Sequence, residues 1–321
     1  MNKLKIIFFG TPHFAVASLS ALQNAGKHIV AVVTAPDQPS GRGLKLNQSP
    51  VKEFALSKNI PVLQPLKLKD PAFLQTIKNY NADLFIVVAF RMMPETLWSM
   101  PPKGTFNLHG SLLPQYRGAA PIHRAVINGE TQTGVTTFFL KHEIDTGAII
   151  FSETIKIEPT DTTGTVHDKL MQIGGELIVK TVNAIEQNNI TTIEQNKLIT
   201  DARNLKHAPK IFKEDCLINW NNTVQHNYNH IRGLSPHPAA FTYLTNTEGK
   251  TLQLKIFFAT KEDAAQPTQP GIITTDQNSY IKISCNNGWL SLTDIQLQGK
   301  KRMPITDFLR GFKINNYTVK K

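Results

Sequence analysis

Short apolar runs alternate with helix-like patterns through the first half of the 321-residue chain. Residues 5–9 form an apolar run, residues 14–22 carry apolar side chains at helical spacing, and residues 29–33 form a second run. A third run, 83–89, is rich in β-forming residues, and a further strand is expected to end near Asn107. Strands that alternate with helices predict an α/β fold, here a Rossmann-like, doubly wound N-terminal domain.

The pattern then changes to a hairpin and a long helix. Alternating apolar residues over 135–140 and 148–155 flank the turn 143–147, which predicts a β-hairpin with Asp145 at its tip. Apolar positions between residues 166 and 185 fit one amphipathic helix, which we expect to close the first domain. Residues 188–204 are polar and have little periodicity, so they predict a linker.

Beyond residue 208 the pattern becomes one of short strands. We expect a helix over 224–232, and strands over 253–260, 271–275, 280–285 and 289–297. Short strands separated by Gly and Pro turns predict a C-terminal OB-like β-barrel, a scaffold that often binds oligonucleotides. The chain is therefore predicted to have a first domain over 1–188, a linker over 189–207 and a barrel domain over 208–321.

Composition narrows the class of protein. Hydrophobic residues make up 40% and charged residues 18%, which is typical of a globular protein, and no apolar run approaches the ~20 residues of a membrane span. The apolar run at the N-terminus is too short for a signal peptide and meets Gly10-Thr11-Pro12. We therefore expect a cytoplasmic protein with no membrane partner.

The two cysteines predict no special chemistry. Cys216 and Cys285 lie far apart and form no metal-binding spacing, so we expect inert thiols in a reducing compartment. No cluster of metal-ligating residues is visible in the sequence, and no metal is expected.

The net charge points to a polyanionic partner. The chain carries 35 Lys and Arg against 24 Asp and Glu, a net charge of +11. Residues 209–321 hold 14 basic and 8 acidic residues (+6), while residues 1–208 hold 21 and 16 (+5). The positive charge is thus denser in the shorter C-terminal part, where a nucleic acid would bind.

Candidate catalytic residues follow a predicted strand. Asn107 and His109 lie at the carboxyl end of a strand, where ligands bind in open α/β sheets, and Asp145 lies in the hairpin turn. Taken alone, His109 fits a structural role better than a catalytic one. Together, the three supply an N–H donor for an oxyanion, an imidazole that can give a proton, and a carboxylate that orients it. This group predicts acyl transfer from an amide.

Dinucleotide binding is disfavoured. The turn after the first strand has a single glycine, Gly10, where the dinucleotide fingerprint requires three, and no acidic residue follows at the expected place. A nicotinamide-dependent dehydrogenase is therefore a weak alternative.

The residues around this group carry a family resemblance. They read Asn107-Leu108-His109-Gly110-Ser111-Leu112-Leu113-Pro114-Gln115-Tyr116-Arg117-Gly118, continued by Ala-Ala-Pro-Ile, with Asp145-Thr146-Gly147 downstream. The chain resembles the formyltransferases that use 10-formyltetrahydrofolate, and within them the members that act on methionyl-tRNA. The resemblance runs from about residue 4 to the end of the chain. It implies transfer of the formyl group to methionyl initiator tRNA, with Asn107, His109 and Asp145 as catalytic residues.

The resemblance also implies where the folate donor binds. The expected contacts are Phe90, Met92, Ser111, Leu112, Leu113 and Pro114. One departure affects this assignment: the segment reads Ala89-Phe90-Arg91-Met92-Met93-Pro94, with Arg91 where the family commonly has Gly and with one residue fewer. Arg91 could meet a carboxylate of the folate tail or point to solvent.

The tRNA contacts implied by the resemblance are basic. Arg42 lies between two glycines on a polar loop, Lys45 follows it, and Lys210 opens the barrel domain. A solvated loop is an equally good interpretation of the Arg42 segment. Lys300-Lys301-Arg302 could be a solvated turn or could follow phosphates.

Two alternatives remain open at this point. The same chemistry could serve an amino-sugar nucleotide or glycinamide ribonucleotide as acceptor, or hydrolyse the same folate. A noncatalytic RNA-binding protein is the alternative of another class, although it would not need Asn107, His109 and Asp145 together. No obligate protein partner is evident, and we expect a monomer.

Overall fold

The computed structural model describes residues 3–40, 45–264 and 268–319. The chain divides into two compact units. The first comprises Met1–Gly118, Thr133–Ile155 and His167–His207, and the second comprises Ala119–Gln132, Lys156–Val166 and Ala208–Lys321. In the described part of the chain, no helix is both long and apolar enough to cross a membrane.

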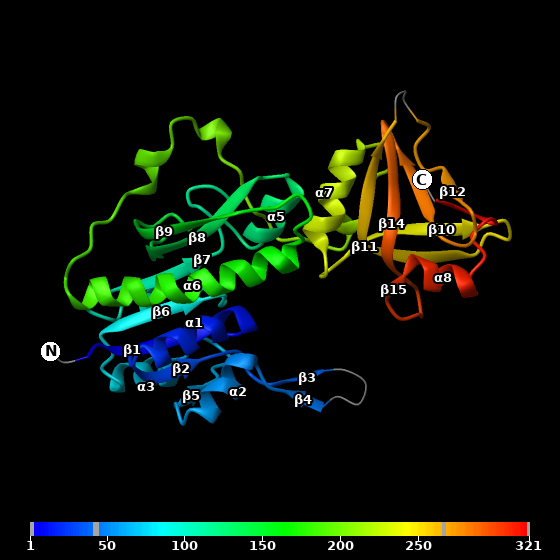
Figure 1. Cartoon of the computed structure of the whole chain (residues 1–321). Coiled ribbons are helices and arrows are strands. Elements are labelled where there is room, and N and C mark those ends of the chain that lie inside the picture. The colour runs from blue at the N-terminus through cyan, green and yellow to red at the C-terminus, as the bar shows by residue number, and fades with distance from the viewer. Residues whose placement is uncertain (1–2, 41–44, 265–267, 320–321) are drawn as a thin grey trace. The chain divides into compact units, whose positions relative to one another are not determined.

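The first unit is built on a seven-stranded sheet with the order β5-β2-β1-β6-β7-β8-β9 (Figure 1). The strands are β1 Lys5–Gly10, β2 His28–Val33, β5 Val62–Leu63, β6 Leu84–Val88, β7 Thr105–His109, β8 Gln132–Phe139 and β9 Ile149–Lys156. The first five are parallel, and β8 runs antiparallel to β7. The predicted α/β fold is confirmed. So is the predicted hairpin around residues 143–147, which is formed by β8 and β9.

Helices cover this sheet because its central strands are apolar on both faces. Residues 6–9 of β1 are fully buried. The first unit contains the helices α1 His13–Asn24, α2 Pro50–Ser57, α3 Pro71–Asn79, α4 Glu95–Trp98 and most of α6 Thr163–Glu186, whereas α5 Pro121–Ile127 belongs to the second unit. Helix α2 begins as its sequence predicts, with Pro50 in the first turn and the Ser49 hydroxyl accepting a hydrogen bond from Lys52 N.

Two adjacent glycines let the long helix α6 approach its neighbours. A Cβ at Gly174 would lie 2.9 Å from Leu108 Cδ2 of β7, and one at Gly175 would lie 3.2 Å from Ala21 Cβ of α1. Residues with side chains would push the helix away from the strand that carries Asn107 and His109.

The polar loop expected around Arg42 contains a short two-stranded ribbon. Strand β3 Gln38–Ser40 pairs antiparallel with β4 Lys45–Asn47. Arg42 lies outside the described residues, and Lys45 is placed only as part of β4.

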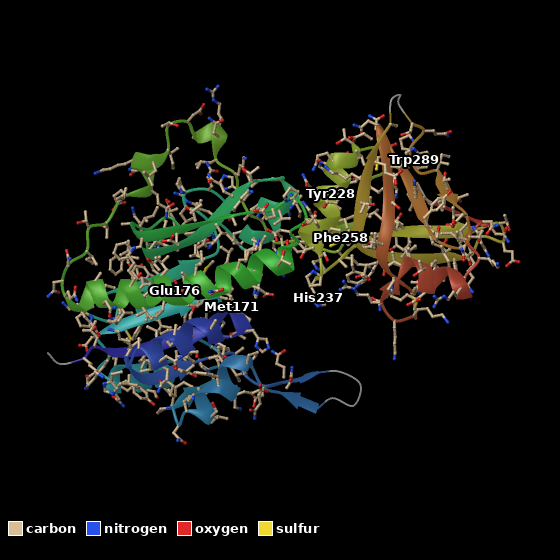
Figure 2. All side chains as sticks on the ribbon, in the orientation of Figure 1. Met171, Glu176, Tyr228, His237, Phe258 and Trp289 are labelled. Carbon is tan, nitrogen blue, oxygen red and sulfur yellow. The ribbon has the colours of Figure 1, made fainter. Side chains whose placement is uncertain are left out.

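The second unit contains an antiparallel sheet, which confirms the predicted barrel-type domain (Figure 1). Its strands are β10 Ala240–Asn246, β11 Thr251–Asp263, β12 Ile273–Thr275, β13 Ile281–Cys285, β14 Gly288–Leu297, β15 Met303–Pro304 and β16 Tyr317–Val319. Helix α7 Val224–Leu234 packs on this sheet: Tyr228 meets Phe258 of β11 edge to face, with ring centroids 6.1 Å apart (Figure 2). The sequence reasoning missed β10, β15, β16 and the helix α8 Ile305–Gly311.

Both cysteines are free thiols buried in this unit. Burial raises the pKa of each thiol, which makes the reactive thiolate less accessible. Two inert thiols, as the sequence predicts, agree with these surroundings.

One half-buried histidine makes stability depend on pH. His230 lies on α7, and among the described residues its Nε2 has no hydrogen-bond partner. Burial, with a smaller contribution from His226, lowers the pKa of His230 from 6.5 to about 4. Between these values the unfolded chain binds a proton that the folded chain excludes. The contribution of neutral His230 to the free energy of unfolding is therefore complete above pH 6.5 and is lost as the pH falls toward 4.

We expect this group to lower the free energy of unfolding by up to about 3 kcal/mol between pH 7 and pH 4. The variant His230→Leu should lose less stability than the wild type over that interval. Denaturant unfolding of the full chain, followed by tryptophan fluorescence at both pH values, measures the difference. His237→Leu, at an exposed histidine just after α7 (Figure 2), is the control; equal pH dependence in the two variants would contradict the expectation.

Candidate active site

Strand β7 presents Asn107 and His109 near its carboxyl end. The two are separated by one residue, so their side chains leave the same face of the sheet. Asn107 pairs with Val87 of β6 on one side and with Phe138 of β8 on the other. Asn107 is half-buried and His109 is 6% exposed. A central strand therefore holds both groups near the carboxyl ends of the parallel strands, where ligands bind in such folds.

Both ring nitrogens of His109 face acceptors. Nε2 lies 2.9 Å from the carbonyl oxygen of Tyr116, and because a carbonyl only accepts, Nε2 must donate. Nδ1 lies 3.7 Å from Asp145 Oδ2, an ion-pair distance. His109 and Asp145, which are 36 positions apart in the sequence, thus meet as the sequence predicts.

Asp145 is held by its own loop and by the one after β7. Its Oδ2 accepts a hydrogen bond of 3.0 Å from Gly118 N, and its φ of 55° lies in the left-handed region. The last position of the Asp-Thr-Gly motif, Gly147, requires glycine, because a Cβ there would lie 1.7 Å from the carbonyl oxygen of Phe139. Any other residue would displace the loop that carries Asp145.

The loop after β7 is fastened to β8 through Thr136. The Thr136 hydroxyl donates to Ser111 O at 2.7 Å and accepts from Leu113 N at 3.2 Å. The Ser111 side chain is fully buried and donates to Gln115 O, while Leu113 packs against Phe138. The side chains of Ser111 and Leu113 therefore face the interior, and the surface of this loop is formed by main-chain groups and by the half-buried Leu112 and Pro114.

In the segment after β6, Phe90 and Met92 differ in how far their side chains are exposed. Phe90 is half-buried and packs edge to face on Phe9, with ring centroids 5.7 Å apart. Met92 is 74% exposed. Arg91 lies at the surface, where it stacks on Phe90 and donates to the carbonyl oxygens of Leu66, at 2.9 Å, and Pro65. Partial burial lowers the pKa of Arg91. Its guanidinium is thus used to tie two loops together.

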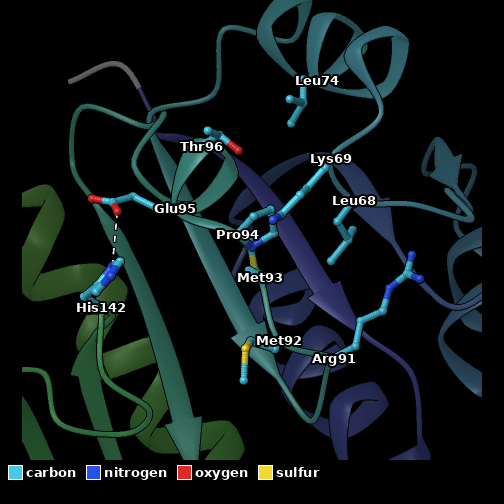
Figure 3. Close-up of a pocket in the computed structure, with 10 residues that line it drawn as sticks. All are labelled: Leu68, Lys69, Leu74, Arg91, Met92, Met93, Pro94, Glu95, Thr96 and His142. Atoms are coloured by element: carbon cyan, nitrogen blue, oxygen red, sulfur yellow. Dashed lines mark ion pairs between the residues drawn. The ribbon is translucent and has the colours of Figure 1, made fainter.

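A cavity of about 730 Å³ opens beside this segment (Figure 3). It is lined by Leu68, Lys69, Leu74, Arg91, Met92, Met93, Pro94, Glu95, Thr96 and His142. His142 Nδ1 and Glu95 Oε2 form an ion pair of 3.2 Å at the lining (Figure 3). Of the predicted folate contacts, Met92 belongs to this lining and Phe90 does not.

The predicted tRNA contacts are described in part. Lys210 is exposed, and its ammonium lies 5.5 Å from the ring centroid of Phe212, itself 58% exposed. Arg302 pairs with Asp294 and stacks 4.1 Å from the centroid of Phe257, whereas Lys300 and Lys301 are exposed.

The sequence reasoning missed Gln195. This residue lies in the segment predicted as a linker, yet it is 1% exposed and its amide contacts both loops that carry the candidate site. One glutamine within a polar stretch gives no signal by which it could have been found. Over residues 3–40, 45–264 and 268–319, no three His, Cys, Asp or Glu side chains gather to hold a metal ion.

Comparison with known proteins agrees with this geometry. Residues 3–182 match the formyl transferase family and residues 210–313 match the formyl transferase C-terminal domain. The methionyl-tRNA formyltransferase of Parabacteroides distasonis is 54% identical over 98% of both chains. That of Azobacteroides pseudotrichonymphae is 53% identical over 97% of this chain and 96% of its own.

Solved structures share the fold at lower identity. WlaRD, a sugar 3N-formyl transferase crystallised with dTDP and 5-N-formyl-THF, is 21% identical with a TM-score of 0.61, covering 94% of this chain and all of its own. HypX from Aquifex aeolicus, in complex with tetrahydrofolic acid, is 16% identical with a TM-score of 0.62, covering all of this chain and 51% of its own. The family matches and the near full-length relatives decide the assignment: the chain belongs to the formyl transferase family, among the methionyl-tRNA formyltransferases.

Proposed function

We propose that this chain transfers the formyl group of 10-formyltetrahydrofolate to the α-amino group of methionyl initiator tRNA. The product is the N-formylmethionyl-tRNA used in translation initiation. The observation that carries the proposal is the identity of about half of all residues to methionyl-tRNA formyltransferases over both domains. The pairing of His109 with Asp145 beside Asn107 supports it chemically.

The reaction demands little of a base and more of an acid. The pKa of the α-amino group in chain termini is about 7.7 to 8.0. At neutral pH part of the amine is therefore already unprotonated and nucleophilic. Attack forms a C–N bond to the formyl carbon and places negative charge on the formyl oxygen. Collapse breaks the bond to N10 of the folate, and the proton lost by the amine must reach that nitrogen.

The three residues fit these tasks. Asn107 donates a hydrogen bond to the oxyanion from its carboxamide. His109 exchanges the bond of its Nε2 to the Tyr116 carbonyl for one to the substrate, and then donates to the same oxygen or passes a proton to N10 through water. Asp145 faces Nδ1 and orients the ring, while the Tyr116 carbonyl holds Nε2 until the substrate takes its place.

Folate binding is assigned to the loops around this group. Met92 supplies an exposed thioether beside an apolar cavity, and the loop over Ser111–Pro114 supplies main-chain donors and acceptors with the surfaces of Leu112 and Pro114. Because the side chains of Ser111 and Leu113 are buried, their contribution is to hold the loop. Phe90 supports Arg91 and the core.

The tRNA is assigned to the basic residues and to the barrel domain. Arg42, Lys45 and Lys210 are assigned to phosphate contacts. The tRNA-binding domain is assigned to residues 208–321, after a first domain over 1–188 and a linker over 189–207. The exposed ring of Phe212 beside Lys210 adds a surface on which a base can stack.

A formylation assay tests the proposal. The chain is incubated with labelled 10-formyltetrahydrofolate and initiator Met-tRNA, with elongator Met-tRNA, an amino-sugar nucleotide and glycinamide ribonucleotide as competing acceptors. Label is expected on initiator Met-tRNA. Label on a sugar nucleotide or glycinamide ribonucleotide instead, or release of free formate alone, would contradict the proposal.

The same assay, run over a range of salt, tests the phosphate contacts. Lys210→Ala should weaken tRNA binding and reduce its dependence on salt, because one phosphate contact fewer releases fewer counterions. Folate binding should not change. An unaltered salt slope would remove Lys210 from the tRNA surface.

A further inference from the structure

Gln195 is the one buried residue within an exposed stretch. Residues 191–194 before it and 196–198 after it are exposed, whereas Gln195 is 1% exposed at the start of the 3₁₀ turn Gln195–Leu198. A primary amide is costly to bury unless its donors and acceptor are all bonded. The partners of this amide therefore identify what the segment is for.

The amide joins the two loops that carry the candidate site. Its Nε2 donates to the carbonyl oxygens of Asp145 and Gly147, both at 2.8 Å. Its Oε1 accepts from Arg117 Nε at 2.9 Å and Nη2 at 2.6 Å. These four bonds use both N–H donors and both lone pairs of the amide. They also fix its orientation, because a guanidinium cannot accept and a carbonyl cannot donate.

The main chain of the same segment reinforces this contact. Ile193 exchanges two backbone hydrogen bonds of 2.9 Å with Ile149, just beyond the hairpin turn. Further along, Lys206 O accepts from Tyr116 N at 2.6 Å, in the loop whose carbonyl contacts His109. The segment is thus bound to both site loops on either side of Gln195.

We propose that Gln195 is a positioning residue that sets the place of the Asp145 carboxylate against the His109 imidazole. The proposal rests on the roles proposed above for His109 and Asp145. Gln195 acts in two ways. Its Nε2 bonds hold the loop in which Asp145 adopts its left-handed conformation. Its Oε1 bonds keep Arg117 away from the Asp145 carboxylate.

Arg117 is the reason that the second effect matters. Partial burial lowers the pKa of Arg117, and the nearby charge of Asp145 opposes that shift. Without a neutral acceptor, this partly desolvated guanidinium gains most by pairing with the Asp145 carboxylate. Asp145 would then pair with Arg117 in place of the His109 ring.

The test compares Gln195→Met, which keeps the length of the side chain and removes its hydrogen bonds, with Gln187→Met at an exposed glutamine after α6. We expect Gln195→Met to lower kcat by about 10²-fold, the effect of a catalytic group displaced by about 1 Å. KM for both substrates should not change. The single-turnover rate should fall by the same factor as kcat, because the chemical step and not substrate binding is affected. Gln187→Met should behave as the wild type.

Two further variants make every outcome decisive. Gln195→Glu keeps an acceptor for Arg117 and loses the donors to the carbonyls, so it is expected to lower kcat also, and it replaces Gln195→Met if that variant does not fold. A folded variant with wild-type kcat overturns the proposal. So does a loss of kcat/KM that comes entirely from a higher KM, or a failure of both variants to fold. Asp145→Asn is measured in parallel: if it retains full activity, the proposed catalytic group is wrong, whereas if it is inactive and Gln195→Met is not, only this inference is wrong.

Discussion

Replacing His109 by alanine is expected to lower the single-turnover rate of formyl transfer by about 10²- to 10⁴-fold, the usual contribution of an acid or base in position. The imidazole is buried at the end of β7 between the Tyr116 carbonyl and the Asp145 carboxylate, and alanine offers no group that can donate in its place. Rapid-quench measurement with saturating enzyme and labelled formyl donor isolates the chemical step from binding. Folate and tRNA should still bind.

His28→Ala is the matched control for this variant. His28 is exposed at the amino end of β2, the opposite edge of the parallel sheet from His109. It should retain the wild-type rate. A near-normal rate for His109→Ala in single turnover would assign the imidazole to structure only.

Replacing Asn107 by alanine is expected to lower kcat by about 10²- to 10³-fold, or roughly 3 kcal/mol, with KM little changed. The carboxamide donates where negative charge develops in the transition state, and that charge is absent from the bound substrate. Asn107 is half-buried on the same face of β7 as His109. The comparison of kcat with KM under steady-state conditions checks this.

Asn24→Ala, at an exposed asparagine of α1, controls for the loss of an amide. Thermal unfolding of both variants should show that each is folded. If Asn107→Ala raised KM at constant kcat, Asn107 would serve substrate binding, and the oxyanion would need another donor.

Much of the first domain follows from local sequence. Fully apolar runs predict central strands of a covered sheet, and β1 and β6 occur where these runs lie. The alternation on either side of residues 143–147 predicts the hairpin that brings Asp145 toward β7. These features are set by neighbours in the chain, so periodicity is enough to find them.

The remaining features depend on partners that are distant in the sequence. Arg117 and Gln195 are 78 positions apart, and Arg91 donates to carbonyls 25 and 26 positions before it. No spacing rule connects such pairs. A buried amide also looks the same in the sequence as an exposed one, so a polar segment reads as a linker until its contacts are known. The short strand β16, whose partner β10 lies about 70 positions earlier in the sequence, was missed because that partner is distant.

The central claim is that Asn107 and His109, two residues of strand β7, reach the formyl group, while Asp145 from a distant loop holds the imidazole. A crystal structure of the chain with a nontransferable formyl-folate analogue tests it most directly. The account predicts the formyl oxygen within hydrogen-bond reach, about 3 Å, of the Asn107 carboxamide and the His109 ring, with Asp145 behind the imidazole. A formyl group bound beyond the reach of both Asn107 and His109 would contradict the account.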